Sequence, residues 1–334
     1  MTTSPTPTDW SPWPFRMALL LVCATFPLIW VGGLVTTYEA GMAVPDWPST
    51  YGYNLFLYPW QTWFFGPWDI FIEHGHRLLG AAVGFIAIGL VAVTWRCDRR
   101  PWMLMFALSA LALVIFQGIL GGQRVLQNAK QLAQLHGVVG PTFLALATAF
   151  LVASSRFWQT AGADDRSTAT PRISWFAWCG VALAWMQLVL GSQLRHADGF
   201  TSPALFGWAL KLHVTIAFSF ALFAVGLAII TYRHRGLSYA RPPGSLLGVL
   251  VGCQVLLGIS TWIFKYGWPA MLGSYTPATT VALQADSMIQ STIVTTHQAV
   301  GALILATSVF LAMRATRFEH AVAPAPEARV GVVT

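Results

Sequence analysis

Eight apolar runs recur along the chain, and each is long enough to cross a lipid bilayer. A membrane-spanning helix needs about 20 predominantly apolar residues. Because a bilayer core holds no water, each run must satisfy its own backbone hydrogen bonds, as a helix does. The runs are 16–37, 75–95, 102–122, 134–154, 173–194, 208–230, 244–264 and 290–312. We therefore predict an all-α membrane protein with eight transmembrane helices.

Charged residues are too few for a soluble protein. They make up 9% of the 334 residues, whereas soluble proteins carry roughly 25%. The net charge of +7 arises mainly from basic loops after the even-numbered runs. The residues of those loops are Arg96, Arg99, Arg100, Arg156, Arg166, Arg172, Arg233, Arg235, Arg241, Arg314 and Arg317. Positive loops stay in the cytoplasm, so we expect a cell inner-membrane protein with both termini cytoplasmic.

The two halves of the chain repeat each other. Three segments of the first half resemble segments at the same places in the second. The pairs are 116–122 with 253–259, 135–140 with 296–301, and 32–35 with 191–194. Because each half holds an even number of spans, both halves point the same way, and their repeat axis runs along the membrane normal. We predict two tandem, pseudo-symmetric four-helix bundles.

This repeat divides the chain into four parts. We expect an N-terminal bundle over 1–156, a cytoplasmic linker over 157–172, a C-terminal bundle over 173–318 and a disordered tail over 319–334. The first outer loop, 38–72, is crowded with Trp, Tyr and Phe. It is typical of an aromatic belt at the membrane interface, and it could instead be a lid over an outer site.

Four histidines occupy equivalent places in the repeat, at the outer ends of the even-numbered runs. They are His76, His136, His213 and His297. Two imidazoles at one depth on two helices of a bundle are what a bis-histidine haem needs. The alternative is that each imidazole forms a hydrogen bond between helices. Their recurrence in pairs favours haem, with the sites toward the outer face of the membrane.

An acidic residue distinguishes the first half from the second. Glu73 lies three residues before His76, so both share one helix face, whereas Lys211 and its neighbours offer no acid before His213. The first half is therefore expected to do chemistry, and the second to carry electrons. An ion pair of Glu73 with Arg77 is the alternative. A di-iron site is disfavoured, because it would need a second Glu-x-x-His and further glutamates inside the spans.

Cationic residues at the outer boundary could bind the propionates of a haem. They are Arg77, Arg124, Arg195, Lys211 and Lys265. Their alternative role is to extend from the apolar region to the polar interface. His74 lies two residues from His76 and faces elsewhere, so it is either a supporting contact or solvated. His196, in an outer loop, is a further possible propionate contact.

Taken together, these motifs resemble the haem A synthase family over residues 16–313. The motifs are Gly32-Gly33-Leu34-Val35-Thr36, Gly41-Met42-Ala43-Val44-Pro45-Asp46-Trp47-Pro48, Glu73-x-x-His76-Arg77, the Gln-x-x-Leu-Gly-Gly of 117–122, Leu135-His136-Gly137, Leu212-His213 and Thr296-His297-Gln298. The resemblance implies oxidation of the C8 methyl of haem O to a formyl group, in two successive steps, giving haem A for terminal oxidases.

The resemblance also implies roles for particular residues. His76 and His136 would hold the substrate haem O, with Glu73 catalytic, while His213 and His297 would hold a haem b cofactor. Many bacterial relatives carry a cysteine pair in the first outer loop. Here those positions are Val44 and Thr50, so a cysteine mechanism cannot operate.

Partners and rival functions follow from the same reading. We expect haem O and membrane lipid as partners, with a haem O synthase and an electron donor as further possibilities, and an oligomer is possible. No basic cluster is interleaved with aromatic residues, so nucleic acid is not expected. One alternative is a di-haem b-type membrane cytochrome that transfers electrons from quinol. Another is a haem transporter, which would need a polar path through the midplane, where few charges lie.

Overall fold

The fold is built from long helices. The computed structural model describes residues 10–161, 173–197, 201–268 and 287–322, and no strand occurs in these ranges. Eight helices there are long and apolar enough to cross a membrane, which confirms the predicted fold class. They are α1 (Trp13–Thr37), α3 (Trp68–Cys97), α4 (Pro101–Leu126), α5 (Lys130–Ser154), α7 (Ser174–Arg195), α8 (Pro203–Arg233), α9 (Arg241–Tyr266) and α11 (Met288–Val322).

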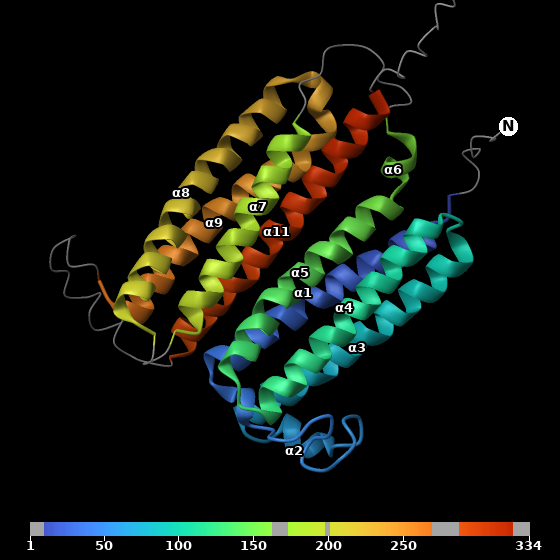
Figure 1. Cartoon of the computed structure of the whole chain (residues 1–334). Helices are drawn as coiled ribbons and strands as arrows, with labels where there is room; N and C mark the ends of the chain where they lie inside the picture. The colour runs from blue at the N-terminus through green and yellow to red at the C-terminus, as the bar shows by residue number, and fades with distance from the viewer. Residues whose placement is uncertain (1–9, 162–172, 198–200, 269–286, 323–334) are drawn as a thin grey trace, which may run out of the picture.

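The long helices pack in two groups of four (Figure 1). In the first group, α1 contacts α3, α3 contacts α4, α4 contacts α5, and α5 returns to α1. The second group repeats this ring with α7, α8, α9 and α11. Helix α11 also lies against α5 and α1 and joins the groups. A small apolar cluster fills this seam, formed by Ile29, Leu144, Ala302 and Ala306.

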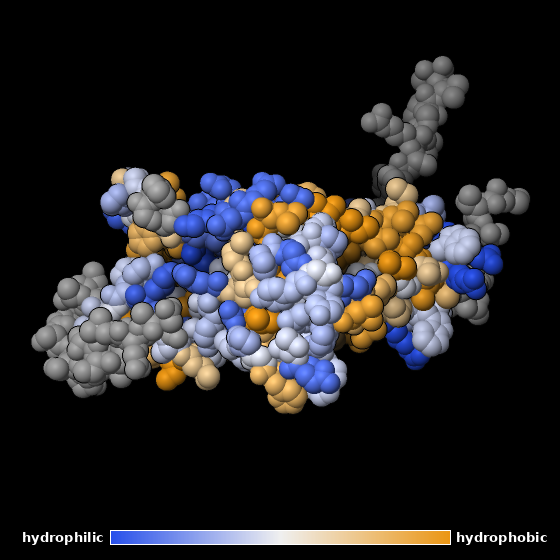
Figure 2. All heavy atoms as spheres, turned by 90° about the horizontal axis from the view of Figure 1, so that it is seen from below, coloured by the Kyte–Doolittle hydropathy of each residue, from blue (hydrophilic) through white to orange (hydrophobic). Residues whose placement is uncertain are grey.

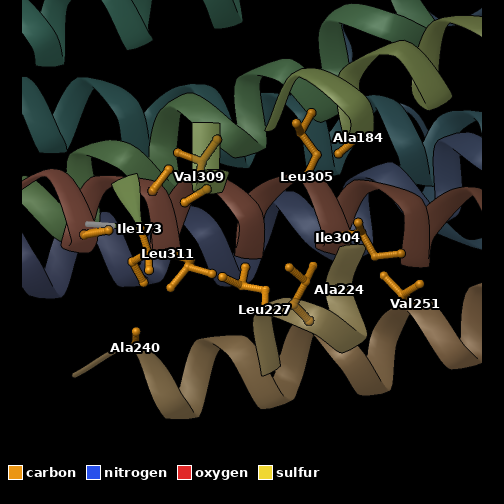
Figure 3. Close-up of a cluster of buried hydrophobic side chains, with 14 of the residues drawn as sticks. Ile173, Ala184, Ala224, Leu227, Ala240, Val251, Ile304, Leu305, Val309 and Leu311 are labelled. Carbon is orange, nitrogen blue, oxygen red and sulfur yellow. The ribbon is translucent and has the colours of Figure 1, made fainter. Parts of the chain in front are cut away.

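Each group has its own apolar core. Phe150, Leu90 and Met103 are fully buried in the first. Figure 3 shows the second, where Leu227, Leu305 and other side chains meet between the helices. Small residues such as alanine recur in both clusters and let the helices approach closely. Within a bilayer such close packing, rather than removal of apolar surface from water, holds helices together.

The outward faces of the helices remain apolar. Leu222 of α8 is 77% exposed and Leu256 of α9 is 67% exposed. The face seen in Figure 2 carries a broad hydrophobic area in its right-hand part, with hydrophilic residues at the right-hand end. Exposed apolar faces on helices of this length suit a lipid environment.

The first outer loop contains two short helices, η2 (Ala40–Met42) and α2 (Trp60–Phe64). Helix α3 follows at Trp68, seven residues earlier than the apolar run predicts. Pro67 stands at its N-cap and Asp69 lies in its first turn, where a carboxylate favours the positive end of the helix dipole. As a result, Glu73 and His76 lie well inside a helix rather than at its first residue.

Two segments at the opposite end differ from the predicted linker and tail. Residues 156–160, which overlap the start of the linker, form the short helix α6 (Arg156–Thr160). Helix α11 continues through residues 319–322 because the Glu319 carboxylate accepts hydrogen bonds from Ile173 N (2.6 Å) and Ser174 N (2.8 Å). The rest of the predicted linker and tail, 162–172 and 323–334, lies outside the described residues.

Candidate functional site

The four predicted histidines come together in two pairs. The ring centroids of His76 and His136 are 6.2 Å apart, and those of His213 and His297 are 6.4 Å apart. A metal–imidazole bond is about 2 Å long, and a ring nitrogen lies roughly 1 Å from its ring centre. Two imidazoles on opposite sides of one metal ion would therefore have centroids about 6 Å apart, and both pairs match this spacing.

Two imidazoles are too few to hold a bare metal ion in a closed site. Among the described residues, no group of three or more His, Cys, Asp or Glu side chains is arranged to bind one. A haem brings its own equatorial nitrogens and needs only axial ligands. The two pairs therefore fit an iron porphyrin better than a free metal ion.

Each of the four rings lies against a glycine of a neighbouring odd-numbered span. The distances run from the Cβ that each glycine lacks to the Cε1 atom of the histidine ring. They are 2.7 Å for Gly32 and His76, 3.0 Å for Gly121 and His136, 3.4 Å for Gly191 and His213, and 3.2 Å for Gly258 and His297. We call these four glycines the platform glycines. Their lack of a side chain leaves room for the rings.

One histidine shows how the rings are oriented. The Nδ1–H of His136 donates to the carbonyl of Gln117 at 3.2 Å, and Gln117 Nε2 donates back to the carbonyl of His136 at 2.8 Å. Donation from Nδ1 leaves the Nε2 lone pair free for a metal. Gln187 repeats the second of these bonds in the other bundle, donating to the carbonyl of His213 at 2.7 Å.

The other three rings approach carbonyls at corresponding positions, each four residues before a platform glycine. These are the carbonyls of Leu28 for His76, Gln187 for His213 and Gln254 for His297. The Nδ1 atoms of these rings are buried and do not reach hydrogen-bond geometry with any described residue. The repeat therefore extends to the surroundings of each ring, with the tightest contact at His136.

A cavity of about 370 Å³ opens beside the first pair. This volume lies within the range of small-molecule sites, about 300–1,000 Å³. Its walls come from α1, α3, α4 and α5, and the outer loop covers it with Trp47 and Pro48. The second bundle also contributes, through Arg195, His196 and Gln298. The cavity of the first bundle is therefore completed by the second.

Glu73 faces this cavity and is held on both oxygens. Its side chain is buried, with Oε2 accepting from the Val44 N–H at 3.0 Å and Oε1 accepting from Arg77 Nη2 at 2.9 Å. The ion pair considered from the sequence thus exists. Glu73 still lines the cavity together with His76, so the ion pair orients the carboxylate without removing it from the site.

Arg77 fastens the outer loop above the cavity. Its Nη1 donates to the carbonyls of Asp46 (2.7 Å) and Ser49 (2.9 Å), and its Nη2 donates to that of Val44 (2.7 Å). We call residues 44–52 the roof. Because these bonds use the donors of Arg77, its guanidinium is committed to the protein.

The roof is also braced from within. The Asp46 carboxylate accepts from Ser49 Oγ, Tyr51 N and Gly52 N. Partial burial raises the pKa of Asp46, but these hydrogen bonds outweigh burial and leave the pKa below its ordinary value. Trp47 fills the space beside Gly122, where a Cβ would lie 2.2 Å from the indole Cδ2. The roof is thus held by the hydrogen bonds to the Asp46 carboxylate and by the packing of Trp47 against Gly122 of α4.

The remaining predicted contacts divide into two sets. Arg77, Arg124 and Arg195 line the cavity, whereas His74 and Lys211 do not. His74 is buried against the aromatic loop, between the rings of Tyr58 and Trp63, with its Nδ1 3.1 Å from Thr50 Oγ1. Lys211 is exposed on α8, with its Nζ 5.3 Å from the Trp208 ring centre.

Two residues of the second bundle stand out at the seam. Arg195 donates to Gly33 O (2.7 Å), to Thr37 Oγ1 (2.7 Å) and to Gln298 Oε1. Next to it, the Nδ1–H of His196 donates to Ser192 O at 3.0 Å. Burial lowers the pKa of His196, so its imidazole is neutral at pH 7. Gln298, which accepts a hydrogen bond from Arg195, had no role assigned from the sequence. It belongs to the Thr296-His297-Gln298 motif, and its place directly after His297 was the only signal that pointed to it.

Comparison with known proteins supports the family resemblance that the motifs indicate. Residues 67–208 match the COX15-CtaA family, described as cytochrome oxidase assembly protein. This stretch contains Glu73, His76 and His136 and ends before His213. No match was found among curated proteins. The resemblance drawn from the motifs is confirmed over residues 67–208, the stretch that is similar to the COX15-CtaA family.

Proposed function

We propose that this protein is a haem A synthase, which oxidises the C8 methyl of haem O to a formyl group in two successive steps. The observation that carries this proposal is the His76–His136 pair, at haem-ligand spacing, opening on a cavity that also holds a buried carboxylate. The family match over the same residues supports it, because haem A synthesis is a step in cytochrome oxidase assembly.

In this proposal the two imidazole pairs have different tasks. His76 and His136 bind the substrate haem O, and His213 and His297 bind a haem b cofactor. The haem iron supplies the oxidising power that side chains lack. The asymmetry supports this division. Among the described residues of the second bundle the only carboxylate is Glu319, 22 residues beyond His297 on α11, whereas Glu73 lines the cavity of the first bundle.

Glu73 is the catalytic residue in this scheme. With dioxygen as the oxidant and two electrons and two protons supplied through the electron donor, each step puts one hydroxyl on the methyl carbon and releases one water. The resulting geminal diol then loses water, and one hydroxyl gives up its proton as the formyl group forms. A carboxylate at the cavity wall can accept such a proton. The hydrogen bonds from Val44 N and Arg77 hold it in one orientation. The roof limits access of water, which strengthens electrostatic interactions inside.

The cellular setting is part of the proposal. In this proposal both termini lie in the cytoplasm and the histidine pairs lie toward the outer face of the inner membrane, an orientation that the positions of the basic loops support. Haem O is apolar enough to arrive from the membrane lipid. A haem O synthase and an electron donor are the partners that the reaction needs, and a homo-oligomer is compatible with it.

Haem analysis tests the proposal. The full-length protein is expressed with a haem O synthase in a host without its own haem A synthase, and acid-extracted haems are separated and weighed by mass spectrometry. Haem A or hydroxylated haem O is expected, and its loss in His76→Ala or His136→Ala ties the product to the first pair. Extracts with haem b alone would favour the di-haem cytochrome, and no retained haem would favour a transporter.

A further inference from the structure

Three arginines reach the cavity, but two of them are already committed to protein acceptors. Arg77 bonds to three roof carbonyls and to Glu73. Arg195 bonds to Gly33 O, Thr37 and Gln298. A guanidinium has five N–H donors in a fixed fork, and in both residues that fork is turned toward the protein. Four of the five N–H donors of Arg77 and three of those of Arg195 are therefore already used by described protein acceptors.

Arg124 differs from the other two. It lies in the last turn of α4 and lines the cavity, and no hydrogen bond or ion pair joins its guanidinium to a described residue. None of its nitrogens is both fully buried and without a hydrogen-bond partner. Since Arg124 lines the cavity, its N–H donors are accessible from the cavity. Glu73 is close enough to act on it electrostatically, but no contact within ion-pair distance joins them, and Arg77 already holds Glu73.

The backbone beside Arg124 is shaped for this guanidinium. A Cβ on Gly41 would lie 2.5 Å from Arg124 Nη1 and 3.2 Å from Cζ. The guanidinium therefore rests against the outer loop at a position where any side chain would displace it. A partly buried cation without a protein acceptor is costly, and this cost falls when a ligand supplies the anion.

The rest of the cavity is apolar away from this point. Val114 lies ten residues before Arg124 on α4, about 15 Å along the helix, and Val114 and Phe143 line the cavity. A ligand bound here would meet a cationic end near the roof and an apolar end deeper in the bundle. His196, the nearby imidazole, is neutral at pH 7 because burial lowers its pKa.

We propose that Arg124 is the carboxylate anchor of the cavity, binding an acidic side group of the ligand and so fixing its orientation against His76, His136 and Glu73. This inference rests on the proposed function, in which the ligand is a haem and the acidic groups are its propionates. An arginine fork and a carboxylate form paired, charge-assisted hydrogen bonds. Arg124 thereby sets which edge of the macrocycle faces the roof.

The test compares two probes that differ only in charge. Iron(III) protoporphyrin IX and its dimethyl ester are titrated into the full-length protein in detergent, with the second pair already loaded during expression, and binding is followed by the Soret band. The wild-type protein should bind the free acid at least about tenfold more tightly than the ester. Arg124→Gln should bind both alike, and Arg124→Lys should recover part of the preference.

Two further variants make the result decisive. Arg99→Gln also removes one positive charge, but from an exposed position after the C-terminal end of α3, at the other end of the first bundle. This variant should keep the full preference for the free acid over the dimethyl ester. Gly41→Ala keeps every charge but crowds the guanidinium, so it should weaken the preference. This second variant tests the anchor even where Arg124→Gln fails to fold.

The outcomes separate this inference from the proposed function. An unchanged preference for the acid in Arg124→Gln, or in Gly41→Ala where Arg124→Gln does not fold, would overturn the anchor while leaving haem binding intact. Binding of neither probe by the wild type, or binding unaffected by His76→Ala, would instead remove the proposed function. A preference lost in Arg99→Gln as well would show that net charge, rather than Arg124, selects the acid.

Discussion

Gly32 lies directly against the imidazole of His76, so closely that a Cβ on the glycine would come within 2.7 Å of the ring Cε1. Real side chains do not tolerate this separation, and the ring would have to turn or the helices separate. The three other platform glycines stand in the same relation to their histidines at wider distances. The position of each ring therefore depends on the absence of a side chain on a neighbouring helix.

This relationship predicts a graded series of glycine-to-alanine substitutions. Overpacking a well-packed site costs about 1–3 kcal/mol, and the cost should follow the distance to the ring. In the first bundle, Gly32→Ala should lower haem A content more than Gly121→Ala. In the second, Gly258→Ala should lower retained haem b more than Gly191→Ala, which at 3.4 Å makes an ordinary contact.

The series is measured by extracting haems from equal amounts of each purified variant. Gly191→Ala serves as the matched control, since it adds the same methyl group at the most spacious of the four positions. Equal losses at Gly191 and Gly258, or at Gly32 and Gly121, would show that the platform distances do not control the rings.

The histidine pairs could be predicted because they depend on repeated local patterns. Helical spans follow from apolar run length, and the repeat places His76, His136, His213 and His297 at one depth. The ring-to-ring distances then follow from packing four helices of similar length around one core. No contact across the bundle had to be known in advance.

The remaining features of the site depend on contacts between distant segments. Trp47 fits beside Gly122, and Arg195 reaches the first bundle from the second. These contacts depend on how the loops and the bundles dock against each other. No local repeating pattern in a single sequence predicts that docking. The early start of α3 likewise followed from Pro67 and Asp69 rather than from hydropathy.

Substitutions at Glu73 should separate catalysis from haem binding. Glu73→Gln keeps an oxygen that can accept from Val44 N, but it cannot accept a proton at neutral pH. We expect haem b to be retained and haem A formation to stop. Glu73→Ala should stop it too and should also lower stability, because Arg77 loses its buried partner, at a cost of about 3–5 kcal/mol.

The measurement is the haem A to haem b ratio in extracts, alongside thermal unfolding of each purified variant. Asp69→Asn, an exposed carboxylate in the first turn of the same helix, is the control and should form haem A normally. Normal product in Glu73→Gln would remove the proton-accepting role.

The roof should respond to pH through Asp46. Its pKa in the folded protein lies below the ordinary value, since hydrogen bonds from Gly52, Ser49 and Tyr51 outweigh the effect of burial. A lowered pKa stabilises the roof at and above the ordinary carboxyl range, about 3.9, and this contribution is lost as the pH falls through the folded pKa. The roof should therefore stay ordered from pH 7 to pH 5 and loosen only in stronger acid.

Hydrogen exchange of the amides of residues 44–52, corrected for intrinsic rates, measures this dependence. Asp46→Asn should exchange faster than the wild type at pH 7 and should show little further change on acidification. Loss of protection already between pH 7 and pH 5 in the wild type would mean that another group controls the roof.

Arg195 should hold the two bundles together. Its donors satisfy Gly33 O, Thr37 Oγ1 and Gln298 Oε1, which belong to α1 and α11. Gly33 O and Thr37 Oγ1 keep a hydrogen bond to each other, and Thr37 Oγ1 also keeps Thr295 Oγ1, so Gln298 Oε1 is the acceptor that loses its partner. An unpartnered acceptor costs about 1–3 kcal/mol, so Arg195→Gln should destabilise the protein by about that amount. Arg233→Gln removes an exposed cation from the end of α8 and should leave stability within about 0.5 kcal/mol. Denaturation in mixed micelles, followed by circular dichroism, gives both values.

Because Gln298 follows His297 directly and lines the first cavity, Arg195→Gln should also lower haem A formation while haem b stays bound. Equal stability of the two variants would show that the seam is held by the packing of Ile29 and Leu144 alone.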